Sequence, residues 1–258
     1  AANALARVHI PPADAEPAPM PSLDLSDGAA DDFARRVTLP LIRGRGDELP
    51  VSAFPADGIW PTGTSRHEKR AIADFIPEWN SSACTECNQC ILICPHAAIR
   101  ATFVPEAALS GAPEGMQSLV WKGPGAQGGE RYVLQVSPAD CTGCRLCVAA
   151  CPRGDVPEGK PRALSMQRLD DARMSVENER WKFFVQLPEP PAGRLEPTLR
   201  TLPMRKPLFE FSGACSGCGQ TPYVRSLTQL FGDRLIMANG TGCSSIYGGN
   251  LPTTPYTK

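Results

Sequence analysis

One arrangement of cysteines occurs twice in this chain, with the spacing C-x2-C-x2-C-x3-C and a proline directly after the last cysteine. The two copies contain, in order, Cys84, Cys87, Cys90 and Cys94, and Cys141, Cys144, Cys147 and Cys151. A run of thiols at this spacing is typical of proteins that bind two four-iron, four-sulfur (4Fe-4S) clusters. The residues with the clearest chemistry therefore predict electron transfer in one-electron steps.

The spacing also predicts which cysteines share a cluster. Three thiolates close together can surround one face of a cluster, whereas the fourth cysteine follows a turn and reaches the other cluster. One cluster is therefore assigned to Cys84, Cys87, Cys90 and Cys151. The second cluster is assigned to Cys94, Cys141, Cys144 and Cys147. Apolar residues between these ligands are expected to keep water from the sulfur atoms, which affects the reduction potential.

Zinc and disulfide bonds are the alternatives for these eight cysteines. Structural zinc usually takes its four ligands from two separated pairs, whereas each copy here adds a third and a fourth cysteine to one pair. Disulfide bonds need an oxidising compartment. His96 follows the first Cys-Pro pair and could ligate a cluster, but the eight cysteines already fill the eight sites. Ligation of iron by cysteine alone is the interpretation that we favour.

The remaining cysteines are Cys215, Cys218 and Cys243. The first two precede a predicted helix over residues 221–231, where Thr221 can cap the helix and Pro222 suits its first turn. Cys243 follows a predicted buried strand over residues 234–238, and this order suggests the start of an α/β domain with a parallel sheet. Two interpretations stay open. The three thiols form one metal site that lacks a fourth thiolate, or Cys243 is a buried free cysteine and the pair binds zinc or nothing.

Composition limits the class of protein. The chain has 258 residues and a net charge of −1, so its charge gives no reason to expect nucleic-acid binding. No apolar run approaches the roughly 18 residues of a membrane span, and no secretory signal opens the chain. Eleven cysteines without such a signal indicate a reducing cytoplasm, where thiols bind metals. The 27 prolines predict many loops and connecting arms.

Shifts in composition divide the chain into four sections. We expect the tail of a preceding domain over residues 1–22, a connecting arm over 23–65, a ferredoxin-like domain over 66–180, and a linker with the start of the α/β domain over 181–258. The expected fold class is therefore α+β, a two-cluster ferredoxin-like domain with extended linkers before the beginning of an α/β domain.

Shorter features lie within the predicted ferredoxin-like domain. Alternating residues predict a strand over 132–136 before the second cysteine run, and residues 163–167 are expected to form a pairing strand after it. Glycine- and proline-rich stretches over 111–129 and 153–161 are expected to be inserted surface loops. The charged run Arg66–Arg70 is expected to be a solvated turn, with a docking patch for an acidic redox partner as the alternative.

Three stretches of this sequence closely resemble the family of pyruvate:ferredoxin (flavodoxin) oxidoreductases. They are SGACSGCGQTPYVRSLTQLFGDRLIMANGTGCSS, CNQCILICPHAAIR and LPVSAFPADGIWPTGTSRHEKR. The resemblance runs from about residue 47 to the end of the chain, and it is specific because the order and the spacing of the motifs agree together. Residues 1–46 match weakly.

The resemblance implies a role for the last three cysteines. It makes Cys215, Cys218 and Cys243 ligands of a third 4Fe-4S cluster, beside thiamine diphosphate, whose fourth ligand lies outside this chain. Gln220 and Cys243 stand at positions of thiamine contacts, although many members have glutamate where this chain has Gln220. The Gly-Asp-Gly motif that binds Mg²⁺ and diphosphate in the family does not occur here. The α/β section is thus expected to be the start of a thiamine-diphosphate-binding domain.

The implied parent enzyme is large, cytoplasmic and usually a homodimer. It oxidatively decarboxylates pyruvate with coenzyme A, giving acetyl-CoA, CO2 and electrons for ferredoxin or flavodoxin. The present chain would be an internal, electron-transferring segment that depends on the rest of the parent polypeptide. We expect no catalytic acid or base in it, and no activity from the segment alone.

Two other functions remain open at the level of the sequence. The chain could be a stand-alone electron carrier of ferredoxin type, with residues 208–258 as an accessory arm whose cysteines bind zinc or no metal. It could also belong to a sister oxidoreductase for another 2-oxoacid. Iron counting distinguishes the carrier, because a two-cluster protein holds about eight irons and a three-cluster protein about twelve.

Overall fold

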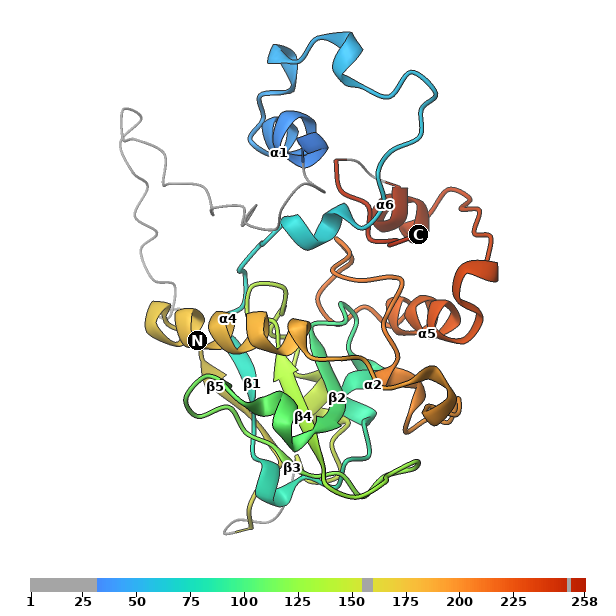
Figure 1. The fold of residues 1–258 in the computed structure, drawn as a ribbon. Coiled ribbons are helices and arrows are strands. Elements are labelled where there is room, and N and C mark those ends of the chain that lie inside the picture. The colour runs from blue at the N-terminus through green and yellow to red at the C-terminus, as the bar shows by residue number, and fades with distance from the viewer. Residues whose placement is uncertain (1–31, 155–159, 250–251) are drawn as a thin grey trace, which may run out of the picture.

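The computed structural model describes residues 32–154, 160–249 and 252–258. Each cysteine run lies in a strand–loop–helix–strand unit (Figure 1). The first unit comprises β1 (Phe75–Trp79), α2 (Gln89–Ile93) and β2 (Ile99–Pro105). The second comprises β4 (Glu130–Val136), α3 (Leu146–Ala149) and β5 (Leu164–Arg168). The strand expected over 132–136 is thus confirmed, and the one expected over 163–167 is shifted by a single residue.

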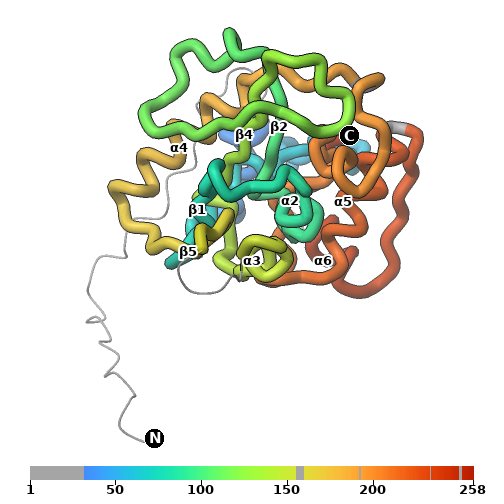
Figure 2. Tube along the Cα trace, turned by 90° about the horizontal axis from the view of Figure 1, so that it is seen from below, coloured from blue at the N-terminus to red at the C-terminus, as the bar shows by residue number. Residues whose placement is uncertain are grey.

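The two units pair with each other in a symmetric way. β1 pairs antiparallel with β5, and β2 pairs antiparallel with β4, so the first strand of each unit joins the second strand of the other. A short strand, β3 (Leu119–Val120), adds to the free edge of β4. Figure 2 shows α2 and α3 next to each other on one side of the strands, with α5 and α6 beyond them. The cysteine loops of both units therefore meet at the same side of the fold.

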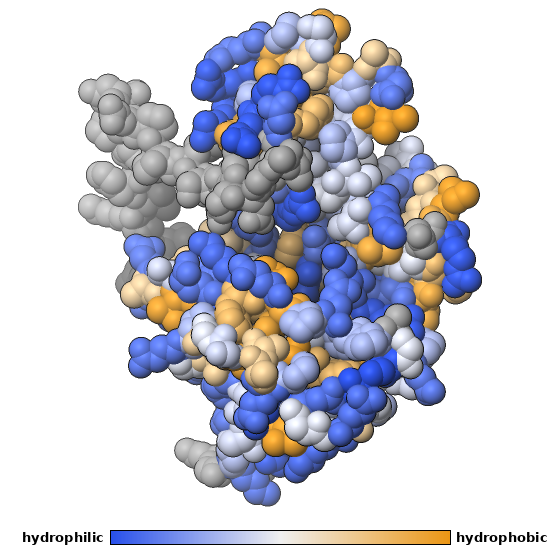
Figure 3. Space-filling model, in the orientation of Figure 1, coloured by the Kyte–Doolittle hydropathy of each residue, from blue (hydrophilic) through white to orange (hydrophobic). Residues whose placement is uncertain are grey.

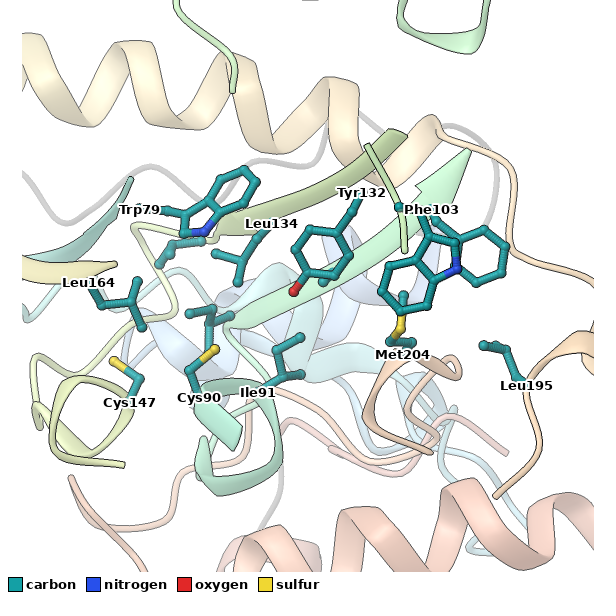
Figure 4. Close-up of a cluster of buried hydrophobic side chains, with 14 residues drawn as sticks. Trp79, Cys90, Ile91, Phe103, Tyr132, Leu134, Cys147, Leu164, Leu195 and Met204 are labelled. Atoms are coloured by element: carbon teal, nitrogen blue, oxygen red, sulfur yellow. The ribbon is translucent and has the colours of Figure 1, made fainter. Parts of the chain in front are cut away.

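The core joins the sheet to the cysteine loops. Cys90 and Cys147 belong to one cluster of buried side chains, in which Figure 4 shows Leu164 of β5 beside Cys147 and Ile91 of α2 beside Cys90. Trp121 stacks between Phe103 and Tyr132, with ring centroids 5.1 and 5.6 Å apart. A side chain at position 123 would lie 2.0 Å from the Trp121 ring, so this layer requires glycine there. The cysteine sites are consequently held by a rigid aromatic core rather than by loops alone.

The longest helix, α4 (Asp171–Gln186), was not predicted from the sequence. Asp170 begins it, because its carboxylate accepts a hydrogen bond of 2.8 Å from the backbone N–H of Arg173. Its apolar side chains are scattered around the helix, and only Trp181 and Phe184 among them are buried. They pack against Phe211. A helix that buries so few residues gives little periodic signal in its sequence.

The arm before the ferredoxin-like domain contains short helices. They are η2 (Ala34–Thr38), α1 (Leu39–Ile42), η3 (Gly46–Glu48) and η4 (Val51–Ala53). The first two lie well away from the strands (Figure 1). Trp60 contacts Phe33 and Phe54, with ring centroids 5.4 and 5.9 Å apart. Residues 1–31 of the expected tail and arm lie outside the described residues.

Single helical turns connect the larger elements. They are η5 (Thr64–His67), η6 (Ser81–Ala83), η7 (Glu106–Leu109), η8 (Ala192–Arg194), η9 (Leu202–Met204) and η10 (Gly232–Arg234). Within the described ranges, none of the helices is both long and apolar enough to cross a membrane.

The C-terminal section contains α5 (Thr221–Phe231) and α6 (Cys243–Gly249). The helix expected over 221–231 is confirmed, and Gly232 ends it. The strand expected over 234–238 is wrong, because this stretch forms no strand and the side chain of Ile236 is 94% exposed. The apolar side chains of Leu230, Phe231 and Met237 are exposed in or just before this stretch, and Figure 3 shows apolar surface at the edge of the molecule where α5 lies. A buried strand needs a neighbouring strand, and the described residues offer none here.

Candidate iron–sulfur centres

The two cysteine loops have the same backbone conformation. The second and fourth residues after the first cysteine are left-handed in both, at Glu86 and Asn88 in the first loop and at Gly143 and Arg145 in the second. Their φ angles lie between 54° and 65°. This conformation is costly for residues other than glycine, and it persists where the surrounding structure requires it. Its repetition at matched positions indicates that both loops are shaped for the same kind of ligand.

Backbone N–H groups turn toward sulfur in these loops. The N–H of Glu86 donates to the sulfur of Cys84 at 3.4 Å, and the N–H of Gly143 donates to the sulfur of Cys141 at 3.5 Å. Such hydrogen bonds favour the thiolate form and stabilise a negatively charged cluster. The loops thus provide donors as well as ligands.

The electrostatic interactions between the thiols indicate which cysteines lie close together. Burial is the main cause that raises the pKa of Cys151, and repulsion from Cys87 and Cys84 of the other loop adds to it. Burial likewise raises the pKa of Cys147, followed by repulsion from Cys94, Cys141 and Cys144. Each fourth cysteine therefore lies near the loop of the opposite unit. Repulsion between Cys90 and Cys147 shows that the two groups adjoin.

The chemistry of these two groups fits 4Fe-4S clusters. Burial raises the pKa of Cys141 to about 12, and it raises the pKa of Cys90 well above the usual thiol range. All eleven cysteines are free of disulfide bonds. No three His, Cys, Asp or Glu side chains of the described ranges are arranged to hold a single metal ion. Soft thiolate ligands in apolar surroundings, with backbone donors to sulfur, are what an iron–sulfur cluster requires.

A network of hydrogen bonds holds the first loop in place, and the charged groups in this network form an ion pair. The hydroxyl of Tyr132 donates to the side-chain oxygen of Asn88 at 2.6 Å, and the Asn88 amide donates to the carbonyl of Arg200 at 2.6 Å. Arg200 in turn donates to the carbonyl of Glu86 at 2.9 Å and forms an ion pair of 3.3 Å with its carboxylate. The linker around residue 200 thus closes over the first loop without adding net charge.

The second loop contacts the C-terminal section instead. The hydroxyl of Ser216 donates to the carbonyl of Thr142 at 3.1 Å. A side chain at position 217 would lie 3.8 Å from the Cβ atom of Cys144, so the two backbones approach closely. Gly217 has a φ of 75°, and it stands at the same place in its C-x2-C pair as Glu86 and Gly143 do in theirs. The third pair of cysteines therefore shares this left-handed position with the other two and lies against the second loop.

The last three cysteines are more open than the first eight. Cys215 and Cys243 are exposed, and Cys218 is partly buried. Burial is the main cause that raises the pKa of Tyr247 to about 12, and repulsion from Tyr256, Cys218 and Cys243 adds to it. Burial alone would raise the pKa of Cys218, but the N–H groups of Thr221 and Gln220 outweigh it and lower this pKa. Cys218 and Cys243 thus both lie near Tyr247 of α6.

Gln220 and His96 have positions that bear on their expected roles. Gln220 precedes α5 and is exposed, and its side chain makes no capping hydrogen bond. Thr221, expected as the cap, is the first residue of the helix. His96 is buried, and its Nδ1 donates to the carbonyl of Ser212 at 3.1 Å. His96 therefore supports the backbone between the second loop and the last cysteines.

The charged run Arg66–Arg70 is not a solvated turn, which corrects the expectation from the sequence. His67 is buried, and the side chains of Glu68, Lys69 and Arg70 are 23%, 22% and 32% exposed. Lys69 pairs with the buried Asp140 at 2.6 Å. The sequence predicted a solvated run because the residue that pairs with Lys69, Asp140, lies far along the chain.

A hydrogen-bonded chain through this run ties distant segments together. Arg70 pairs with Glu68 at 2.6 Å, and the same carboxylate oxygen of Glu68 accepts a hydrogen bond of 2.7 Å from Thr253. Asp140, the partner of Lys69, directly precedes Cys141. The run therefore links the second cysteine loop to the end of the chain.

Comparisons with known proteins agree with this geometry. Residues 83–154 match the family described as a 4Fe-4S dicluster domain, and residues 24–73 match EKR, described as a domain of unknown function. The chain is 50% identical over 234 residues to a pyruvate-flavodoxin oxidoreductase of Rhodospirillum rubrum, which covers 91% of this chain and 20% of that protein. It is 48% identical over 226 residues to a pyruvate:ferredoxin oxidoreductase of Moorella thermoacetica, covering 88% and 19%.

A further relative has a different printed name. The chain is 45% identical over 231 residues to a pyruvate dehydrogenase [NADP(+)] of Cryptosporidium parvum, which covers 88% of this chain and 11% of that protein. The chain thus spans about a fifth of the length of the first curated relatives that it matches. The resemblance inferred from the sequence motifs is confirmed, and a 4Fe-4S dicluster domain lies where the two cysteine runs predicted it.

Proposed function

We propose that this chain is the electron-transferring segment of a pyruvate:ferredoxin or pyruvate:flavodoxin oxidoreductase. The observation that carries the proposal is the contact between the third cysteine pair and the second cysteine loop, at Ser216–Thr142 and Gly217–Cys144. A stand-alone carrier with an accessory arm has no need of this contact. A relay needs it, because electrons must pass from the third group of cysteines to the doubled motif.

The contacts also support an order for the relay. The loop with Cys215 and Cys218 lies against the second loop, and Cys90 of the first loop adjoins Cys147 of the second. An electron would therefore pass from the third group to the Cys94–Cys141–Cys144–Cys147 group, and then to the Cys84–Cys87–Cys90–Cys151 group. We propose that the last group delivers it to ferredoxin or flavodoxin.

The residues of this chain would hold and insulate three clusters, which supply one-electron redox chemistry when bound. Cys84, Cys87, Cys90 and Cys151 would hold one cluster. Cys94, Cys141, Cys144 and Cys147 would hold the second cluster. Cys215, Cys218 and Cys243 would hold the third with a ligand from elsewhere in the parent polypeptide. Apolar side chains such as Ile91 and Trp79 exclude water from the first two groups.

The remaining parts of the proposal concern the whole enzyme. It would decarboxylate pyruvate with coenzyme A in the cytoplasm, as a homodimer with thiamine diphosphate and Mg²⁺. Apolar side chains of α5 are exposed, with values of 75% for Tyr223, 41% for Leu227 and 48% for Phe231. The rest of the thiamine-binding domain would cover them. Gln220 and Cys243 would face thiamine. The four sections proposed from the sequence would be the units of this assembly.

Iron counting tests the proposal. We expect about twelve irons per chain in the anaerobically reconstituted full-length protein and about eight in its Cys218→Ser variant. Pyruvate-dependent reduction of ferredoxin should require the third cluster and should be absent from the 258-residue segment alone. A count of about eight irons that Cys218→Ser leaves unchanged would favour the stand-alone carrier. Activity with a different 2-oxoacid but not pyruvate would favour a sister oxidoreductase.

A further inference from the structure

Arg225 is a buried cation on α5 that none of the sequence motifs singles out. Its side chain is only 2% exposed. The guanidinium donates to the carbonyl of Cys94 at 3.0 Å and to the carbonyl of Leu92 at 2.6 Å. These carbonyls lie at the C-terminal end of α2, directly at a cysteine that the sequence assigns to the second cluster. α5 begins just after Cys218, so the helix that follows the third cysteine pair carries Arg225 to Cys94.

The charge of Arg225 has no carboxylate partner within 4 Å among the described residues. Its Nε atom likewise has no hydrogen-bond partner in that part of the chain. Other arginines of the same region differ, because Arg100 pairs with Glu210 and Arg200 pairs with Glu86. Burying a guanidinium without a counter-charge is strongly unfavourable. The position therefore calls for a negative charge that the protein side chains do not supply.

We propose that Arg225 is the electrostatic partner of the cluster held by Cys94, Cys141, Cys144 and Cys147, and that it favours the reduced state of this cluster. The inference rests on the proposed function. Four thiolate ligands give such a cluster a net negative charge, and the electron that it accepts from the third group adds one more. A fixed cation beside Cys94 stabilises the extra negative charge of the reduced cluster, and it therefore raises the reduction potential of this cluster.

A purely structural role is the alternative. The two carbonyls are unpaired ends of α2, and an arginine at a helix C-terminus satisfies such groups whatever lies beyond them. The two roles make different predictions, because a capping role depends on hydrogen bonds whereas the proposed role depends on charge. Arg205 provides a matched control. It also donates to backbone carbonyls, of Leu195 and Gln229, and neither of them belongs to a cysteine.

The test compares Arg225→Gln, Arg225→Lys and Arg205→Gln in the reconstituted full-length holoprotein. Reduction is followed by EPR-monitored redox titration, and the second cluster is identified as the couple that Cys147→Ser abolishes. For Arg225→Gln we expect a fall of at least tenfold in the equilibrium constant for reducing this cluster, which is about 59 mV for a one-electron couple. Arg225→Lys should recover most of the shift, and Arg205→Gln should leave the potential unchanged.

Several results would overturn the inference. They are an unchanged potential in Arg225→Gln, an equal shift in Arg225→Lys, or an equal shift in Arg205→Gln. If Arg225→Gln loses the iron of the second cluster, retention of that iron by Arg225→Lys supports the role of charge, and its loss from both variants contradicts it. Failure of the proposed function is a separate result, because the unmodified holoprotein would then lack the third cluster or pyruvate-dependent reduction.

Discussion

The two cysteine loops share one backbone but lie in different electrostatic surroundings. Both have left-handed residues at the same two positions and a backbone N–H that donates to the first sulfur. The first loop is closed by Arg200, whose charge is paired with Glu86. The second cluster differs, because Cys94, its assigned ligand from the first run, lies beside the buried Arg225, which donates only to carbonyls. Local sequence therefore determines what kind of cluster binds, and distant residues determine how readily each cluster accepts an electron.

Loss of a ligand should have the largest effect, and the effect should differ between regions. Cys147 lies in the hydrophobic core, so Cys147→Ser should remove about four irons and also destabilise the fold. Cys218 lies outside that core, so Cys218→Ser should remove a similar amount of iron and leave the far-UV circular dichroism unchanged. Iron analysis and thermal melting of both variants check this contrast. Equal melting temperatures would show that the second cluster does not stabilise the core.

Removal of a buried ion pair should come next. In Lys69→Met, the carboxylate of Asp140 would stay buried beside Cys141 without its partner, which should cost about 3–5 kcal/mol of unfolding free energy. The double variant Lys69→Met/Asp140→Asn should recover part of this loss. Lys182→Met is the matched control, because its pair with Glu179 is exposed and should be worth under about 0.5 kcal/mol. Urea unfolding of the holoprotein measures the unfolding free energy of these three variants. An equal loss of unfolding free energy in Lys69→Met and Lys182→Met would refute the expected role of burial.

The thiols of Cys218 and Cys141 should react with an alkylating reagent at different pH values. The pKa of Cys218 is lowered, so its thiolate forms below the pH of an ordinary thiol, about 8.5. The pKa of Cys141 is raised to about 12, so its thiolate forms only in strongly alkaline solution. Alkylation of iron-free protein should therefore modify Cys218 near neutral pH and leave Cys141 unmodified, as peptide mass spectrometry would show. Denatured protein is the control, in which both should react alike, and prior labelling of Cys141 in the folded protein would contradict the prediction.

The smallest effect concerns the network at the first loop. Tyr132→Phe would leave the side-chain oxygen of Asn88 buried without its donor, at a cost of about 1–3 kcal/mol. The potential of the second cluster should not change, because this network contacts Glu86 and Asn88, which lie among the ligands assigned to the first cluster. Denaturant titration and redox titration of one variant give both values. A shift in the second potential would show that the two surroundings are not independent.

Much of the doubled motif could be predicted from the sequence, because its chemistry lies in short runs. The spacing of the cysteines predicted the dicluster domain, and alternating residues predicted β4. The strand expected over 234–238 failed, since a buried strand depends on partners that the described chain does not contain. α4 was missed because it buries few residues.

The electrostatic surroundings could not be predicted in the same way. Lys69 and Asp140 are 71 positions apart, and Arg225 meets Cys94 from 131 positions away. Arg225 occupies a helix on which the apolar side chains of Tyr223 and Leu227 are exposed, while the polar side chains of Thr228 and Gln229 are buried. The helix pattern in the sequence was correct, but its orientation depends on the surface that it meets.

The central claim is that each cluster takes its fourth ligand from the opposite loop, and this is tested most directly by EPR-monitored redox titration of Cys94→Ser and Cys151→Ser holoprotein. We predict that Cys94→Ser perturbs the couple that Cys147→Ser abolishes, and that Cys151→Ser perturbs the couple that depends on Cys87. Perturbation of the Cys87-dependent couple by Cys94→Ser, and of the Cys147-dependent couple by Cys151→Ser, would contradict the account.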